Sequence, residues 1–271
     1  MRNKNKNMVL KYGIVFSALL FVISSCSRSG QLPQKISEKT AINSVILNHS
    51  FLQANYTFHN DSVIKSDFGN ELEKLFQEKR KFEDNNSTFN LTGLENTWKT
   101  LQNQRNNFNL ENIKQWIEIT GFLLELSGNT AYANELEETI YKSAALFNEQ
   151  EYNEIEKKIV PWIFTKDLDN IYINLFANAS IKYDHSLKGA VEIMQETNYP
   201  ESGKIKLKFK MEEKRYIELF IRIPEWAEDA TVTETGVKYV ANPGTYSQIL
   251  RKWGEGDSVV INFPIEKMPK Q

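Results

Sequence analysis

The chain has 271 residues, of which 33 are basic, 35 are acidic and 41% are hydrophobic, a composition typical of a globular protein of one or two domains. Its slight acidic excess argues against a partner that is a nucleic acid. Its single cysteine excludes an intramolecular disulfide and a metal site built from several thiolates.

Residues 1–25 have the pattern of a bacterial lipoprotein signal peptide. Four basic residues precede an apolar run at 12–23, which is too short to span a membrane. The stretch ISSC that ends at Cys26 resembles a lipobox, in which the cysteine is acylated and becomes the new N-terminus. We therefore expect lipidation of Cys26 and a protein anchored by lipid to a membrane of the bacterial cell envelope. An uncleaved anchor, or a secretory signal with an incidental cysteine, is the alternative.

Residues 26–60 are predicted to be a tether followed by an uncertain segment. The polar stretch 27–40 contains glycine and proline, as flexible linkers do, although an extended segment packed on the protein body is an alternative. The stretch 41–60 fits a helix and a strand equally well. If residues 1–25 are removed, 29 basic residues remain against 35 acidic ones, so the remaining chain is more acidic.

Residues 61–166 are predicted to form a helical domain. Apolar residues recur there at spacings of three, four and seven, which is the period of an amphipathic helix. The residues that set this pattern are Phe68, Leu72, Leu75, Phe76, Phe82, Ile113, Trp116, Ile117, Thr120, Leu124, Tyr132, Leu136, Ile140, Ala144, Phe147, Tyr152, Ile155, Ile159 and Trp162.

Helix ends can also be placed in this domain. Thr92 with Glu95 fits a capping box, and Asn109 is a candidate N-cap. Gly128 is predicted to end one helix and Asn129 to begin the next, so these two helices must run antiparallel. Asn148 followed by Glu151 predicts a further start, and the picture is one of stacked helical hairpins.

Residues 167–271 are predicted to form a β-sandwich. Apolar residues alternate with polar ones in the segments 171–177, 204–211, 216–224, 245–253 and 257–265. In KIKLKFKM (204–211) every second residue is apolar and the others are lysines. Burial of one face is typical of an antiparallel sheet, so the sequence predicts an α+β protein whose two parts meet near residues 165–170.

Candidate catalytic and metal-binding residues are few. His49, His59 and His185 share no ligand spacing and are more simply packed or surface residues than ligands or bases. The pair Glu137 and Glu138 lies on a helix rich in charge and is predicted to be solvated.

Other residues have both a binding and a structural interpretation. Glu192 and Glu196 could form a glycosidase pair, although their separation cannot be read from the sequence. The lysines at 204–210 could meet an acidic polysaccharide, but a solvated strand face is the simpler interpretation. Trp226 and Trp253 could stack on sugar rings, and packing in the core is favoured for both.

A resemblance to a known family extends this interpretation. Four stretches occur in the order found in the zinc-dependent β-L-arabinofuranosidases of glycoside hydrolase family 127 (GH127), and the stretch 123–144 is similar to a helical hairpin of that family. The resemblance covers roughly residues 110–265. Its four stretches are Asn174-Leu175-Phe176, Gln195 to Pro200, Arg222 to Trp226, and Trp253 to Asp257.

The resemblance implies part of an (α/α) toroid of helical hairpins followed by an antiparallel β-sandwich, with the chain shortened at both ends relative to the family. It also implies a zinc held by a glutamate and cysteines, a cysteine nucleophile and a separate glutamate as acid/base. Asn109 and Glu111 stand where two zinc ligands are expected, and 145–160 contains no cysteine. Glu95 lies near the position of the acid/base, but the surrounding match does not carry that role over.

These observations predict a degenerate relative of GH127 with no catalytic residue, no metal and no cofactor. A carbohydrate-related binding or accessory role at the cell envelope, toward plant or cell-wall carbohydrate, is the favoured function. No carbohydrate-binding residue can be named from the sequence. The alternatives are a glycoside hydrolase that uses carboxylates alone, a structural or partner-binding lipoprotein, and the remnant of a broken gene.

Overall fold

The computed structural model describes residues 44–52, 68–187 and 189–268. They belong to one compact unit. Cys26 and His59 lie outside the described residues. No helix in the described ranges is both long and apolar enough to cross a membrane.

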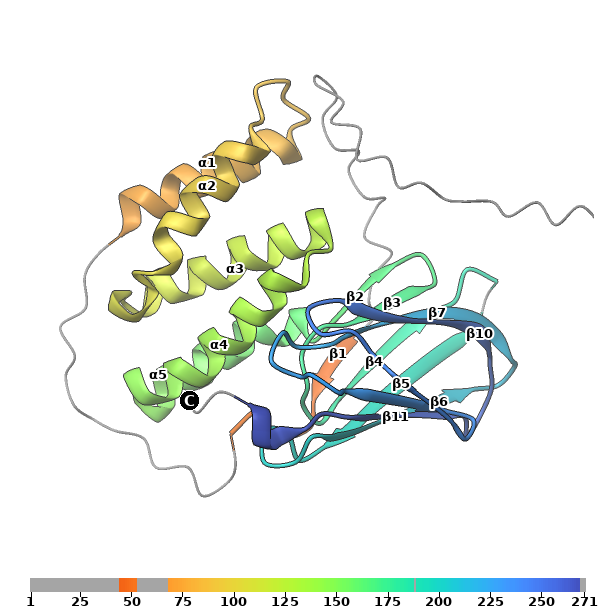
Figure 1. The fold of residues 1–271 in the computed structure, drawn as a ribbon. Helices are drawn as coiled ribbons and strands as arrows, with labels where there is room; N and C mark the ends of the chain where they lie inside the picture. Colours follow the sequence, from red (N-terminus) through yellow and green to blue (C-terminus); the bar gives the residue numbers. More distant parts are fainter. Residues whose placement is uncertain (1–43, 53–67, 188, 269–271) are drawn as a thin grey trace, which may run out of the picture. The chain divides into compact units, whose positions relative to one another are not determined.

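In the described residues, five α-helices precede most of the strands, as the hydrophobic period predicts (Figure 1). Helix α3 contacts α1, α4 and α5, and Trp98 of α2 stacks on Trp116 of α3 with ring centroids 5.1 Å apart. The described part of the chain is thus α+β, and the partial toroid stays a prediction. The helices are α1 (Gly69–Glu83), α2 (Leu91–Gln102), α3 (Leu110–Ser127), α4 (Thr130–Leu146) and α5 (Glu149–Ile159), with 3₁₀ turns η1 (Arg105–Asn107), η2 (Val160–Trp162) and η3 (Ile265–Lys267).

Most predicted helix ends are confirmed. Asn109 and Asn129 cap α3 and α4 through their side chains, and Asn148 with Glu151 forms a complete capping box on α5. The predicted capping box of Thr92 is wrong, because α2 begins two residues earlier than that box requires. Asn90 is its N-cap and accepts a hydrogen bond from the backbone N–H of Gly93 at 2.9 Å.

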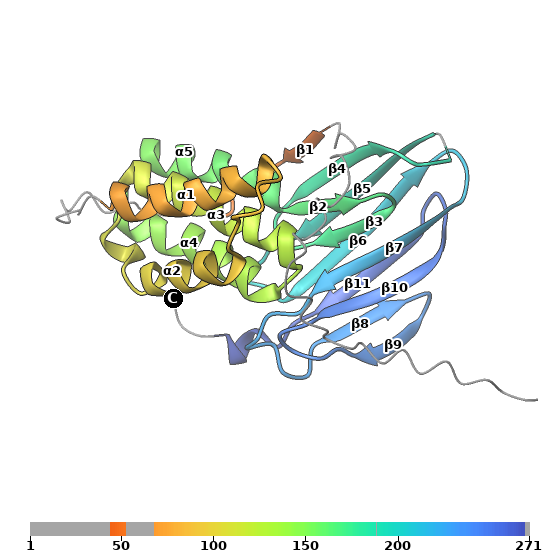
Figure 2. The same cartoon turned by 90° about the horizontal axis from the view of Figure 1, so that it is seen from above.

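Two sheets make up the β part. One has the order β1-β4-β5-β6-β11-β8-β9 and the other the order β10-β7-β3-β2 (Figure 2). Phe209 of the first sheet stacks on Trp253 of the second at a centroid distance of 4.2 Å, so the sheets pack face to face. The strands are β1 (Ser44–Leu47), β2 (Phe164–Asp167), β3 (Asn170–Ile173), β4 (Ala179–Asp184), β5 (Ala190–Thr197), β6 (Lys204–Met211), β7 (Arg215–Arg222), β8 (Thr231–Glu234), β9 (Val237–Val240), β10 (Tyr246–Trp253) and β11 (Ser258–Asn262).

The strand predictions are right where alternation is long and incomplete elsewhere. Strand β6 has the predicted bounds, and its apolar residues are buried. Strands β2, β4, β5, β8 and β9 were not predicted, and the ambiguous stretch after residue 41 contains strand β1. The predicted antiparallel pairing is confirmed for the large sheet, whereas in the four-stranded sheet β3 pairs with β7 in parallel.

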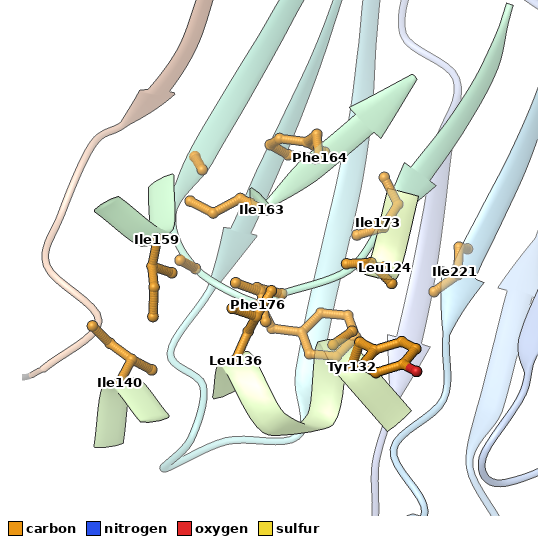
Figure 3. Packing of buried hydrophobic residues seen from close by; sticks show 14 of the residues in the cluster. Leu124, Tyr132, Leu136, Ile140, Ile159, Ile163, Phe164, Ile173, Phe176 and Ile221 are labelled. Carbon is orange, nitrogen blue, oxygen red and sulfur yellow. The ribbon is translucent and has the colours of Figure 1, made fainter. Parts of the chain in front are cut away.

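One continuous core joins the helices to the sandwich. Buried side chains from α3, α4, α5, β2, β3 and β7 belong to a single cluster, part of which Figure 3 shows. Leu136 and Ile140 of α4 lie in this cluster together with Phe176, which follows β3. The two parts are therefore held together by apolar burial, the main favourable contribution to folding.

Candidate functional site

A cleft of about 270 Å³ opens where the last turn of α3 meets the four-stranded sheet. Gly128 ends α3 in the left-handed conformation, with φ of +63°, and so turns the chain sharply at the wall of the cleft. The cleft is lined by Leu124, Glu125, Leu126, Ser127, Gly128, Thr165, Lys166, Asp167, Tyr172 and Tyr246.

Two tyrosine rings supply the aromatic part of the cleft. Tyr172 of β3 and Tyr246 of β10 meet edge to face with centroids 5.5 Å apart, and Tyr172 also stacks on Phe220 at 4.5 Å. Burial raises the pKa of both phenols, so both hydroxyls are protonated at neutral pH. The rings are therefore fixed in place and present neutral, partly apolar surfaces.

Polar groups border these rings. Glu125 of α3 and the pair Lys166 and Asp167 of β2 line the same cleft. The last carbonyl groups of a helix lack donors from within the helix, and the last turn of α3 belongs to the lining. A cleft with fixed rings, carboxylates and carbonyl groups can bind a molecule that offers C–H faces to the rings and hydroxyl donors to the oxygen atoms.

Asn174 links the turn η2 to strands β2 and β10. The Tyr246 hydroxyl donates to Asn174 Oδ1 at 2.6 Å, while Asn174 Nδ2 donates to Thr165 Oγ1 at 3.0 Å and to the Trp162 carbonyl at 3.2 Å. Asn174 is completely buried. Because Tyr246 and Thr165 both line the cleft, this amide fixes the positions of two of its wall residues.

Arg222 and Glu137 form a buried junction between the sandwich and α4. The fully buried Arg222 guanidinium is paired with the Glu137 carboxylate and with Asn134, and its Nε donates to the Asn174 carbonyl at 2.5 Å. The Tyr199 hydroxyl also donates to Glu137. The prediction of a solvated Glu137 is therefore wrong, whereas the side chain of Glu138 is 55% exposed and pairs with Arg105 and Lys142.

The signal for Glu137 was present in the sequence. Ala133, Leu136, Ile140 and Ala144 are buried on α4, and Glu137 falls on the same face at spacings of three and four. A carboxylate on an apolar stripe requires a buried cation. What the sequence did not reveal is that Arg222, 85 positions later, is that cation.

Other residues of the four motif stretches hold the backbone. The Gln195 amide donates to the carbonyls of Leu175 and Ala177 at 3.0 and 2.8 Å. The Trp253 indole donates to the Ile217 carbonyl at 2.9 Å, and Asp257 accepts from the Gly254 N–H at 2.9 Å. These side chains fix turns and strand ends, and none of them lines the cleft.

The histidines do not form a site within the described residues. His49 is exposed, whereas His185 is buried and contacts the Tyr216 carbonyl at 2.9 Å. No group of three or more His, Cys, Asp or Glu residues in the described ranges is placed to hold a metal ion.

Glu192 and Glu196 are both engaged in ion pairs on β5. They lie four residues apart on this strand, which separates their backbones by about 13 Å. Each is paired with a lysine, Glu192 with Lys182 at 3.3 Å and Glu196 with Lys208 at 2.5 Å. Neither lines the cleft.

The lysines of β6 and the two tryptophans have structural roles, as the simpler interpretation of the sequence predicts. The lysines at 204–210 occupy the outward positions of their strand. Trp253 is fully buried, and Trp226 packs edge to face on Phe263 at a centroid distance of 5.9 Å. The tryptophan rings are therefore engaged in packing.

The residues at the expected zinc positions do not fit a zinc site. Asn109 uses its side chain to cap α3, and Glu111 forms an ion pair with Lys114 at 3.0 Å. The stretch 145–160 contains α5 and no cysteine. Glu95 is half-buried and accepts a hydrogen bond from the Tyr132 hydroxyl at 3.0 Å, and the burial of Tyr132, together with this charge, raises the pKa of its phenol.

A comparison with family models matches residues 170–265 to the model described as "Beta-L-arabinofuranosidase, GH127 middle domain". Residues 170–265 are therefore similar to the middle domain of GH127. No curated protein matches the chain significantly. The matched range contains Arg222, and thus the sandwich side of the junction, and it contains both cleft tyrosines, Tyr172 and Tyr246. Strand β2, which also lines the cleft, precedes the matched range.

Solved structures give weaker similarities. A GH127 β-L-arabinofuranosidase from Geobacillus stearothermophilus T6 is 24% identical with a TM-score of 0.46, covering 56% of this chain and 30% of that one. A protein described as a glycoside hydrolase has 22% identity, a TM-score of 0.47 and coverages of 57% and 32%. A GH127 β-arabinofuranosidase has 20% identity, a TM-score of 0.45 and coverages of 54% and 30%. The chain spans about a third of the length of these proteins.

Proposed function

We propose that this GH127 relative is a lipid-anchored, non-catalytic protein of the bacterial cell envelope that binds carbohydrate in the cleft beside α3. The observation that carries the proposal is the pair Tyr172 and Tyr246, which lies within the range matched to the GH127 middle domain and forms the aromatic part of the cleft. Aromatic rings beside hydroxyl acceptors suit the two kinds of surface that a sugar offers.

The absence of catalysis is inferred from the residues that the family chemistry requires. The only cysteine is Cys26, which belongs to the predicted lipobox. Asn109 and Glu111 are engaged in a helix cap and an ion pair. A thiol mechanism assisted by zinc therefore has neither its nucleophile nor its ligand set.

Calorimetry with the purified full chain tests the binding function. The names of the similar proteins give L-arabinofuranose as the first sugar to try, so the probe is an oligosaccharide that contains it. We expect saturable binding that is weakened in the Tyr172→Ala variant and unchanged in Tyr216→Ala, because Tyr216 does not line the cleft. No heat of binding with any of a panel of plant and cell-wall oligosaccharides contradicts the proposal.

A glycoside hydrolase that uses carboxylates alone is the second candidate, because Glu125 and Asp167 both line the cleft. Turnover of an aryl arabinofuranoside distinguishes it from a binding protein. Loss of turnover in both Glu125→Gln and Asp167→Asn would establish the hydrolase and replace the non-catalytic proposal.

The surface of the helices argues against the alternative that the protein is the remnant of a broken gene. A toroid that had lost helices would expose the apolar faces that those helices once covered. Among the described residues, none of the exposed large hydrophobic residues lies on an α-helix; they are Ile46, Leu168, Leu187, Tyr216, Val237, Val240 and Leu250. The five helices bury their apolar faces among themselves and against the sandwich.

A further inference from the structure

Two neighbouring turns of the sandwich expose leucine side chains. Leu168, in the turn between β2 and β3, is 60% exposed, and Leu187, in the turn between β4 and β5, is 72% exposed. The turns are joined, because the Ser186 N–H donates to Asp169 Oδ1 at 3.1 Å and the Ser186 hydroxyl donates to the same carboxylate. The leucines are therefore held at the same end of the sandwich.

A buried histidine supports this pair of turns. His185 is 4% exposed, its Nδ1 accepts from the Leu187 N–H at 3.1 Å, and its Nε2 contacts the Tyr216 carbonyl at 2.9 Å. Tyr216 itself is 61% exposed. Leu168, Leu187 and Tyr216 thus form an apolar tip, built on fixed backbone. Single exposed apolar residues are common on proteins, but a joined group of them marks an interaction surface.

The chain that precedes the described residues enters at this same end. In the pairing of β1 with β4, Ser44 lies opposite Lys182, and β4 continues from there to Asp184 and into the turn that carries Leu187. The other end of β1 leads toward the helices, where the Ser50 hydroxyl donates to Glu156 of α5 at 2.6 Å. Seventeen residues lie between Cys26 and Ser44, so the chain between these two can reach at most about 65 Å.

We propose that the apolar tip of Leu168, Leu187 and Tyr216 contacts the lipid bilayer that holds the anchor. This inference rests on the proposed function in taking Cys26 as the lipidated residue. Leucine side chains suit the boundary of the acyl chains and a tyrosine suits the level of the headgroups. The Nζ of Lys252 lies 6.0 Å from the Tyr216 ring centroid, where a lysine can reach the headgroups while its stem stays on apolar surface.

Charges of both signs lie near the apolar tip, which favours apolar lipid contact over recognition of an anionic headgroup. Arg215 is paired with Glu213, and the carboxylate of Asp169 is bonded to Ser186. Apolar insertion depends little on salt, whereas attraction between exposed charges is screened by it. We therefore expect the contact to persist at high ionic strength.

A fluorescent label at the tip tests the inference on the full chain. In the Leu187→Cys variant the new thiol is labelled with an environment-sensitive dye, and the protein is reconstituted into vesicles of phosphatidylethanolamine and phosphatidylglycerol. Lipids with nitroxide on the acyl chain should quench this dye several-fold more than a dye at Val240→Cys. Val240 is 69% exposed, and its strand pairings place it at the opposite end of the sandwich. Adding Leu168→Asp should reduce the quenching at position 187.

The outcomes separate this inference from the proposed anchor. The wild-type chain is treated with the dye in parallel, and a labelled wild type means that Cys26 is free and the anchor is wrong. In that case the same comparison is made in the Cys26→Ser background, where quenching at 187 still supports the tip. The inference is overturned by equal quenching at 187 and 240, or by no quenching at 187. It is also overturned if the emission of the dye at 187 shifts to the blue without vesicles, because that shift indicates contact with another copy of the chain.

Discussion

Arg222 of β7 and Glu137 of α4 form an ion pair from which solvent is nearly excluded, with side-chain exposures of 0% and 10%. The carboxylate also accepts from Tyr199, and the guanidinium also donates to Asn134 and to the Asn174 carbonyl. Each guanidinium nitrogen and each carboxylate oxygen thus has a hydrogen-bond partner, as a buried pair needs if its Coulombic attraction is to offset desolvation.

Removing one partner of this pair is expected to be strongly destabilising. Glu137→Ala leaves a buried guanidinium without its counter-charge and should lower the free energy of unfolding by about 3–5 kcal/mol. Glu83→Ala is the control, because Glu83 belongs to an exposed pair on α1 and its loss should cost about 0.5 kcal/mol or less. Urea unfolding measures both. Equal losses in the two variants would place Glu137 in solvent after all.

Strand β6 offers a test of which face is buried. Leu207→Asp places a charge in the fully buried layer between the sheets and should cost several kcal/mol. Lys206→Asp, on the outward face of the same strand, should cost little. Thermal unfolding of the two variants is the measurement. Equal melting temperatures would contradict the assignment of Leu207 to the buried face of β6.

Glu135 should make stability depend on pH. This carboxyl is 2% exposed, and its burial raises its pKa above 4.5 in spite of the nearby Arg105. A raised pKa means that the folded state binds the proton more tightly than the unfolded state. The protonated Glu135 therefore contributes to stability at low pH, and this contribution is lost as the pH rises through the folded pKa. The free energy of unfolding of the neutral Glu135→Gln variant should therefore increase relative to that of the wild type as the pH rises from about 4.5. Unfolding in urea across this range tests the sign, and a wild type that gains on the variant contradicts it.

The tyrosines of the cleft should determine affinity for sugar. Tyr172→Ala removes one ring face and is expected to weaken binding about tenfold, which corresponds to about 1.4 kcal/mol. Tyr246→Phe keeps the ring and loses the hydrogen bond to Asn174, so it should retain most of the affinity and lose about 1 kcal/mol of stability. Calorimetry and urea unfolding measure the two effects. A Tyr172→Ala variant that binds as tightly as the wild type would exclude the cleft as the binding site.

Lipidation is tested at the only cysteine. Cys26→Ser should abolish the incorporation of labelled palmitate and release the protein from the membrane fraction. A variant with unchanged labelling and mobility would show that the stretch ending at Cys26 is not a lipobox.

The sequence predicts those parts of the fold that depend on local pattern. Gly128 and Asn129 define a helical hairpin because both act on the backbone beside them. The alternation in 204–211 defines β6 for the same reason. Thr92 was misassigned because Asn90, two residues earlier, is an equally good cap and the sequence does not rank them.

Pairings between distant segments could not be predicted. Strand β3 pairs in parallel with β7, and Glu137 forms an ion pair with Arg222. Both depend on how distant segments pack, which a single sequence does not specify. The cleft is of the same kind, since Glu125 and Tyr246 come from elements 121 positions apart. Residues with local roles were thus predictable, and the site was not.

Strand β1 has a consequence for the order of events during synthesis. It pairs with β4 about 130 residues later in the chain, so it leaves the ribosome long before its partner exists. Until then its backbone donors and acceptors are open to pairing with other chains, the usual hazard of an unpaired strand. At only four residues, Ser44–Leu47, the strand is a poor template for such pairing, and it can complete the edge of the sheet only once β4 has been made.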